Sequence, residues 1–208
     1  MIMKKILTAI LFTAIATGSL APGVAFSEPV NSINLGLGGI VQTMPHCKAK
    51  VYIVEYERMI SPTTSVLGRA SEVSYKFDDK INYTEEGRPR GIDIGARFYP
   101  GGNMRGFFIT GVLGKWRSDW RFSHNMGRPD QWSGDGTSDS IRASVDIGGR
   151  FQIGSSSVSI MPALNFGKFF SSINCEFTSP SSRVGQECKQ SSEVIAYMFL
   201  GVTAGVGF

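Results

Sequence analysis

One stretch of the sequence, IRASVDIGGRFQI (141–153), alternates between apolar and polar residues. Its odd positions carry isoleucine, alanine, valine, glycine and phenylalanine. Its even positions include Arg142, Asp146 and Arg150. Successive side chains of a β-strand point to opposite faces, so this pattern predicts a strand with one apolar face and one charged face.

The same period of two recurs along the chain. In residues 92–98, apolar side chains alternate with Asp93, Gly95 and Arg97. In residues 108–122, we assign the parity with the aromatic residues, such as Trp116, to the outer face of a sheet. We assign the other parity, with Lys115, Arg117, Asp119 and Arg121, to the inner face.

Eight segments fit this alternation, and the connections between them differ in length. Short connections (61–65, 100–104, 154–157) alternate along the chain with long polar ones (43–50, 78–89, 123–139, 178–191). Such alternation is typical of outer-membrane barrels. The predicted strands are 31–42, 50–60, 65–78, 89–99, 105–122, 139–153, 158–177 and 191–208.

A soluble sandwich would also alternate, but some of these strands alternate over about 15 residues, whereas strands usually have 5–6. The chain also ends in Phe208 with apolar residues at every second position before it. We therefore predict an all-β fold: a closed, antiparallel, eight-stranded transmembrane β-barrel. The hydrocarbon core of a membrane offers no hydrogen-bond partners to the backbone. A spanning sheet therefore has to close on itself, so that every backbone N–H and C=O group is paired within it.

Residues 1–27 resemble a secretory signal peptide. Lys4 and Lys5 precede an apolar run, and small residues precede a cut between Ser27 and Glu28, with a cut after Ala25 as the alternative. The apolar run is shorter than the roughly 20 residues of a spanning helix. We thus expect residues 28–208 to form the barrel in the outer membrane of a Gram-negative bacterium. Loss of the two lysines lowers the formal charge from +4 to +2, and no nucleic-acid partner is inferred.

The inner parity collects charges of both signs, seven acids and seven bases once Glu193 near the mouth is counted. An eight-stranded barrel is just wide enough for side chains to fill. Buried charges need partners, so we predict a plug of paired side chains; a narrow or gated pore is the alternative. The predicted lumen charge network comprises Glu55, Glu57, Glu72, Lys76, Asp93, Arg97, Lys115, Arg117, Asp119, Arg121, Arg142, Asp146 and Arg150.

One strand resists this assignment. If Glu72, Ser74 and Lys76 face inward, the same parity aims Arg69 at lipid, unless a β-bulge near Gly68 shifts it.

Three cysteines remain after residue 27, and export permits disulfides. Cys175 and Cys188 flank a Ser/Pro/Gly-rich stretch and are the candidate pair, which leaves Cys47 unpaired or bonded elsewhere. None of the three has the spacing of a metal site, and no cofactor is expected.

The whole chain after residue 27 resembles the small OmpA/OmpX-type outer-membrane barrels in architecture. Two segments, VEYER (54–58) with Ser61-Pro62 and GARFYPG (95–101), resemble uncharacterised outer-membrane barrel families. The resemblance covers about a third of the chain and brings no activity. It implies that Glu57 and Arg97 are lumen residues near periplasmic turns. Phe208 resembles the assembly signal that the barrel-assembly machinery would recognise.

No catalytic constellation is predicted. His46 and His124 are the two histidines, and adjacent Ser123 and His124 would point to opposite faces of a strand. A lipid A-modifying enzyme is therefore the weaker alternative to a structural or surface-interaction role. Asp130, Asp135 and Asp139 do not fit a calcium-loop template.

Two kinds of partner are expected. Basic residues near the outer rim, Arg88, Arg90 and those in 115–121, would meet lipopolysaccharide phosphates. A surface ligand would bind through loops 123–139 and 178–191.

Overall fold

The computed structural model describes residues 30–40, 47–78, 82–124, 131–179 and 182–208, with the backbone alone for 40, 132 and 173–196. The predicted signal peptide therefore lies outside the described residues. No helix in the described part of the chain is long and apolar enough to cross a membrane.

The described chain is built from antiparallel strands. They are β1 (Asn31–Ile40), β2 (Cys47–Ser61), β3 (Thr64–Asp78), β4 (Tyr83–Gly87), β5 (Arg90–Phe98), β6 (Gly106–His124), β7 (Trp132–Gln152), β8 (Val158–Ser179) and β9 (Ser182–Gly207). Each strand pairs with the next along the chain, apart from the β4–β5 step, where both strands lie between β3 and β6.

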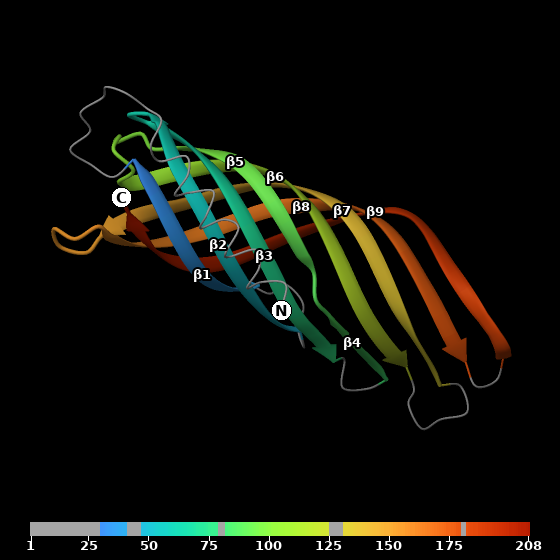
Figure 1. Cartoon of the computed structure of the whole chain (residues 1–208). Coiled ribbons are helices and arrows are strands. Elements are labelled where there is room, and N and C mark those ends of the chain that lie inside the picture. Colours follow the sequence, from blue (N-terminus) through green and yellow to red (C-terminus); the bar gives the residue numbers. More distant parts are fainter. Residues whose placement is uncertain (1–29, 41–46, 79–81, 125–130, 180–181) are drawn as a thin grey trace.

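The sheet closes on itself through its first and last strands (Figure 1). The β1–β9 ladder runs from the Ser32–Gly207 pair to the Ile40–Phe199 pair. At its end, Phe208 N donates to Asn31 O at 2.9 Å and Asn31 N donates to Phe208 O at 3.0 Å. The prediction of a closed antiparallel barrel with a ring of eight strands is confirmed.

Strands β4 and β5 together form one position in this ring. Gly87 and Arg90 keep the same register against β3 and against β6, so only Arg88 and Pro89 interrupt the ladder. Val73 N donates to Pro89 O at 2.7 Å, but proline has no N–H to return to Val73. The missing bond explains why one strand is divided in two.

The strands extend further than the sequence analysis predicts. Segments 123–139 and 178–191 were expected to be loops, but β6 continues to His124, β7 begins at Trp132, and β8 and β9 pair up to Ser179 and Ser182. Figure 1 shows these strands projecting at one end of the barrel, here called the long-strand end. The other end, the short-turn end, carries the C-terminus and the turn after β7. Polar residues such as Ser, Gly and Thr continue the hairpins because the backbone ladder needs no apolar side chains.

The backbone register places Cys175 directly opposite Cys188 in the β8–β9 ladder. Opposed residues of an antiparallel pair have Cα separations of about 4.5–5.5 Å, within the range of a disulfide. The register thus permits the disulfide, which stays a prediction, as does the role of Phe208 as an assembly signal.

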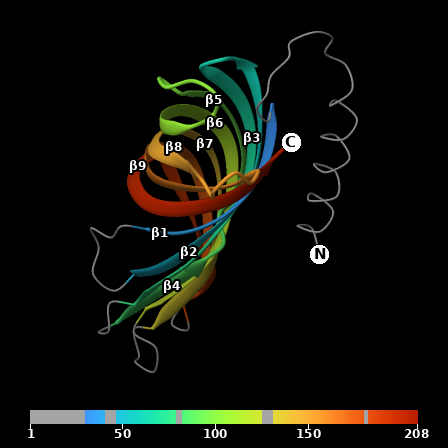
Figure 2. The ribbon, with the colours of Figure 1, turned by 90° about the vertical axis from the view of Figure 1, so that its left-hand side faces the viewer.

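An apolar belt covers the outside of the barrel. The side chains of this belt have exposed fractions of 37% or more. In a soluble protein, large apolar side chains are mostly buried and charged ones exposed, which is the reverse of this arrangement. The strands that carry the belt curve around the barrel axis in Figure 2. Its members include Leu35, Leu37, Ile92, Ile94, Phe98, Ile109, Leu113, Ile141, Val145, Ile147, Phe151, Ile160, Leu164, Phe166, Leu200, Val202, Val206 and Phe208.

Inward-facing glycines make room for buried polar side chains. Gly114 lies opposite Asp93 in the β5–β6 ladder, and a Cβ on Gly114 would overlap the Asp93 carboxylate. Gly111, on the outer face of the same strand, has nothing within 4 Å of such a Cβ. Side-chain size is therefore constrained at the inward Gly114 and not at the outward Gly111.

We expect Gly114→Ala to destabilise the barrel by about 1–3 kcal/mol, because the new methyl group would displace the Asp93 carboxylate. Urea unfolding in lipid vesicles, followed by the gel mobility of the folded form, measures this change. Gly111→Ala is the matched control and should unfold like the natural protein. Equal effects of the two substitutions would contradict the packing described here.

Candidate functional site

Eight ionisable side chains are buried inside the described part of the barrel, and their charges balance. Four are carboxylates and four are guanidinium groups, all 6% exposed or less. Burial of a lone charge costs several kcal/mol, so equal numbers in one space indicate a paired network. The members of this lumen network are Glu55, Glu57, Arg69, Asp93, Arg97, Arg142, Asp146 and Arg150.

Glu55 joins two of the arginines. Arg69 Nη2 lies 2.7 Å from Glu55 Oε2 and 2.5 Å from Asp146 Oδ2. Arg97 Nη1 lies 3.0 Å from Glu55 Oε1. Glu55 thus links β2 to β3 and β5, and Arg69 extends the connection to β7 through Asp146.

Glu57 accepts hydrogen bonds from four groups. Arg97 Nη1 donates to Glu57 Oε2 at 2.8 Å, and Arg150 Nη1 donates to the same atom at 3.0 Å. The hydroxyls of Ser65 and Tyr99 donate to Oε1. The VEYER and GARFYPG segments therefore meet at Glu57, which the structure places in the lumen together with Arg97.

A second group surrounds Asp93 nearer the long-strand end. Arg142 Nη1 donates to Asp93 Oδ2 at 2.7 Å, and Trp116 Nε1 donates to Oδ1 at 2.7 Å. Arg142 Nη2 also donates to Asn165 Oδ1 at 3.0 Å, and Asn165 Nδ2 donates to Asp146. Asn165 thereby links the two parts of the lumen network.

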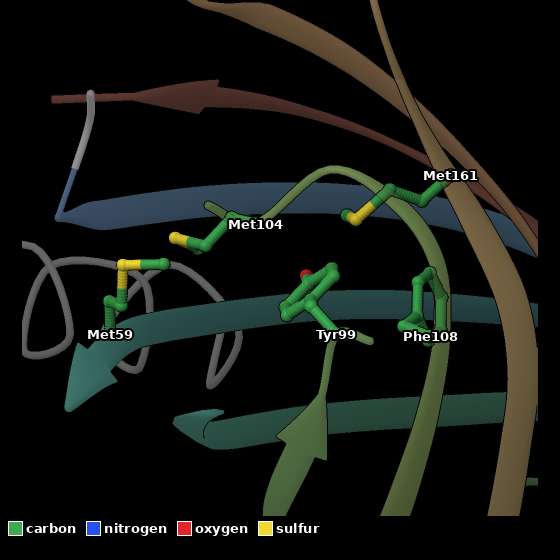
Figure 3. Packing of buried hydrophobic residues seen from close by; sticks show 5 residues of the cluster. All are labelled: Met59, Tyr99, Met104, Phe108 and Met161. Atoms are coloured by element: carbon green, nitrogen blue, oxygen red, sulfur yellow. The ribbon is translucent and has the colours of Figure 1, made fainter. Parts of the chain in front are cut away.

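An apolar cluster, here called the apolar cap, lies in the lumen at the short-turn end. Figure 3 shows Met59, Tyr99, Met104, Phe108 and Met161 converging there. Met104 comes from the turn between β5 and β6, where Asn103 and Met104 have φ values of 57° and 51°. This left-handed backbone is uncommon for methionine, and it directs Met104 under the barrel, where it is only 3% exposed.

Aromatic side chains occupy the lumen above the charges. Phe169 contacts Trp116 and Tyr197, with ring centroids 5.4 Å and 4.9 Å apart. The Arg142 guanidinium lies 5.1 Å from the Trp116 ring centre and 5.3 Å from that of Tyr197. Cation–π contacts of this kind stabilise a buried cation. Three groups of side chains thus point into the lumen: the apolar cap, the charge network and the aromatic residues.

Almost every buried polar atom of this filling is satisfied. Among the described buried side-chain nitrogen and oxygen atoms, the Ser71 hydroxyl alone has no hydrogen-bond partner. Native interiors show this degree of satisfaction.

Six members of the predicted lumen charge network face outward in the structure, four on β6 and two on β3. Lys115, Arg117 and Arg121 lie on the exposed parity of β6 with Asp119, while Phe108, Trp116 and Phe122 are buried on the other parity. The charges of β6 share the outward parity of the belt residues Ile109 and Leu113. Its aromatic residues fill the lumen instead.

Strand β3 shows the same reversal. Its register is continuous from Ser65 to Phe77 against β2, with no bulge near Gly68. Arg69 therefore faces inward, and Glu72 and Lys76 lie on the outward parity. The need for partners for Glu55 and Asp146 was the sequence signal that would have identified Arg69.

At the long-strand end, beyond the apolar belt, Tyr75 and Tyr83 each donate a hydrogen bond to Glu85, at 2.6 and 2.5 Å. Burial and the Glu85 carboxylate raise the pKa of Tyr83. Both Glu85 oxygens thus accept phenolic hydrogens.

Of the residues that the sequence analysis weighed for catalysis, Ser123 and His124 are described in the structure. Ser123 Oγ lies 2.6 Å from Thr84 Oγ1, and the next residue, His124, belongs to the opposite parity. His46 and Asp130 lie outside the described residues. Within the described ranges, no cluster of three His, Cys, Asp or Glu side chains is suited to a metal ion.

Comparisons with known proteins give the fold. No protein-family model matches the chain, and no curated protein matches its sequence. A major outer-membrane protein of Thermus thermophilus is similar in structure, with a TM-score of 0.57 at 10% identity over 86% of this chain and 99% of that one. The attachment invasion locus protein Ail of Yersinia pestis has a TM-score of 0.51 at 12% identity, covering 87% and 99%. OprG of Pseudomonas aeruginosa has a TM-score of 0.51 at 12% identity, covering 87% and 98%.

The fold is that of a small outer-membrane β-barrel. The apolar belt is what such a barrel presents to lipid, and it agrees with the predicted location in a Gram-negative outer membrane. At these identities, the likeness concerns the fold.

We expect Glu57→Gln to destabilise the barrel by about 3–5 kcal/mol, because it leaves buried guanidinium groups short of a counter-charge. Urea unfolding in lipid vesicles provides the measurement. Adding Arg150→Gln should restore part of the loss, because the pair is then removed together.

Arg121→Gln is the control for the Glu57 and Arg150 substitutions. The ion pair of Arg121 with Asp135 is exposed, with side-chain exposures of 71% and 75%. Its loss should change stability by less than about 1 kcal/mol. If Glu57→Gln were equally mild, the lumen network would not be the buried, paired cluster described here.

Proposed function

We propose that this protein is an integral outer-membrane barrel with a structural or surface-interaction role, whose lumen is plugged by charged side chains. The observation that carries the proposal is the balance, among the described residues, of four buried carboxylates and four buried guanidinium groups joined by ion pairs of 2.5–3.0 Å.

Energetics support a closed lumen. Opening a water path would separate pairs such as Arg142–Asp93, whose side chains are 1% and 0% exposed. Removing one partner of such a buried pair typically costs about 3–5 kcal/mol. The apolar cap with Met104 adds a second barrier at the short-turn end.

A surface role is supported by the projecting strands. Beyond the apolar belt, β6 and β7 present exposed charged residues such as Arg121 and Asp135. Long paired strands hold these residues in fixed positions, whereas flexible loops would lose conformational entropy on binding. The expected surface ligand would therefore meet strand extensions as well as the connections between them.

A narrow, gated channel is the second candidate. It is favoured by the polarity of the lumen network, which would solvate ions if its side chains rearranged. Conduction requires that the charge network and the Met104 cap both move.

Conductance of the purified protein in planar bilayers tests the proposal. We expect no steady nanosiemens-scale pore, because paired side chains and the cap fill the lumen. Insertion is checked on the same sample by heat-modifiable gel mobility after flotation of the vesicles. A steady conductance from protein inserted in this way would refute the plug and favour the channel.

A further inference from the structure

The inward face of the barrel changes in character at the long-strand end, where the ends of β3 and β6 flank β4 (Figure 1). The ionisable side chains of the lumen network are 6% exposed or less. Nearer the long-strand end, five side chains of the same inward parity are partly exposed. They are Tyr75, Phe77, Tyr83, Glu85 and Trp120, here called the aromatic mouth. Solvent therefore reaches this group, which four aromatic rings and one carboxylate make up.

Glu85 lies between aromatic residues in the β-ladder. Phe77 on β3 and Phe122 on β6 are its direct register partners. Opposed residues of an antiparallel pair have Cα separations of about 4.5–5.5 Å, so these side chains stand next to the carboxylate. The phenols of Tyr75 and Tyr83 donate to Glu85 Oε1 and Oε2 at 2.6 and 2.5 Å. Because both oxygens accept a hydrogen bond, the carboxylate is held in place among the rings.

Two inward glycines hold further rings close to the wall. Gly87 lies between Tyr75 and Trp120 in the adjacent row of the ladder, and Gly136 is the next partner of Trp120. A Cβ on Gly87 would come within 2.6 Å of the Tyr75 ring, and a Cβ on Gly136 would overlap the Trp120 ring. Each ring therefore occupies the space above a glycine of the neighbouring strand, next to the row that contains Glu85.

The described lysines and arginines of these strand ends face away from Glu85. All lie on the outward parity, and they are Lys48, Lys50, Lys76, Arg88 and Arg121. The adjacent acid Glu86 shows the contrast, because its register partners on the outer face are Lys76 and Arg121. The outward acid is thus placed between bases, whereas the inward acid is placed between aromatic rings.

This combination of groups suits an alkylated cation. A quaternary ammonium ion donates no hydrogen bond, so it does not compete with the phenols for the Glu85 oxygens. It is attracted to the negative faces of aromatic rings within about 6 Å of the ring centre, and proteins recognise such ions with cages of aromatic side chains. The ring centres of Phe77 and Tyr83 are 6.0 Å apart, and a nearby carboxylate adds a full negative charge.

We infer that the aromatic mouth binds a quaternary ammonium group, with the cation beside Glu85 and in contact with the rings of Tyr75, Phe77, Tyr83 and Trp120. The inference goes beyond the proposed function, because it holds whether or not the lumen below is closed. The cation would belong either to a free small molecule or to the choline head group of a lipid, and the two sources share this chemistry.

Isothermal titration calorimetry of the full folded chain in maltoside micelles, whose head groups carry no ammonium, tests the inference with choline as the probe. We expect saturable binding of one choline per barrel. The neutral analogue 3,3-dimethyl-1-butanol has the same shape without the charge and should bind at least about tenfold more weakly. Glycerophosphocholine distinguishes the sources: affinity equal to that of choline would indicate a lipid head group, and weaker binding a free cation.

Two matched pairs of variants locate the site. Glu85→Gln should weaken choline binding at least about tenfold, whereas Glu86→Gln removes the same charge from the outer face and should bind normally. Phe77→Leu should weaken binding because it removes a ring and leaves the carboxylate in place. Phe151→Leu, in the apolar belt, should have no effect. Heat-modifiable gel mobility shows that each variant has folded.

Three results would overturn the inference. Absence of saturable choline binding to the folded protein would show that the aromatic mouth is not a cation site. Equal affinity for 3,3-dimethyl-1-butanol would show that the rings bind any apolar group of this size. Equal losses in Glu85→Gln and Glu86→Gln would show a general attraction to the charged strand ends instead of a site at Glu85.

Discussion

The desolvation of charge inside a closed sheet is the constraint on which this structure depends. In the described part of the barrel, four guanidinium groups and four carboxylates lose their water when the ring closes, and each needs a partner of opposite charge within reach. The partners come from strands far apart in sequence, as in the Arg150–Glu57 contact. Register errors would leave charges unpaired, so the lumen network specifies which strands meet and at what height.

This constraint explains the composition of two sequence segments, VEYER (54–58) and GARFYPG (95–101). Glu57 of the first segment holds Arg97 and Tyr99 of the second, and the turn that follows them carries Met104 into the cap. Inward glycines such as Gly114 complete the arrangement by leaving space for carboxylates. The outer face carries no such constraint, which is why aliphatic residues of many shapes occupy it.

Much of the fold was predictable from alternation alone. The period of two identified the spanning strands, and the polar parity of β2, β5 and β7 identified Glu55, Glu57, Asp93, Arg97, Arg142, Asp146 and Arg150, which the structure brings together in the lumen. The β6 assignment was wrong because residues 106–114 carry no charged side chain on either parity, so their alternation does not reveal which parity faces lipid. In the structure, Trp116 turns inward and Arg117 turns outward.

The predicted facing of the β3 residues was wrong for a related reason. Glu72 and Lys76 lie on the outward parity, and hydrophobicity could not separate them from the inward Arg69. Counting partners for the buried carboxylates would have separated them, since Glu55 and Asp146 both need Arg69. The extensions of β6 to β9 were missed because their polar residues resemble those of loops. Pairing within a hairpin, which sequence periodicity does not report, makes them strands.

The most direct measurement of the central claim is the exchange of arginine Nε–H protons with water, recorded by nitrogen-edited NMR of the folded protein in micelles. Buried, ion-paired guanidinium groups exchange slowly, so Arg69, Arg97, Arg142 and Arg150 should give protected signals while Arg121 exchanges rapidly. Rapid exchange of all five would show that water reaches the lumen, and it would contradict a barrel filled by paired charges.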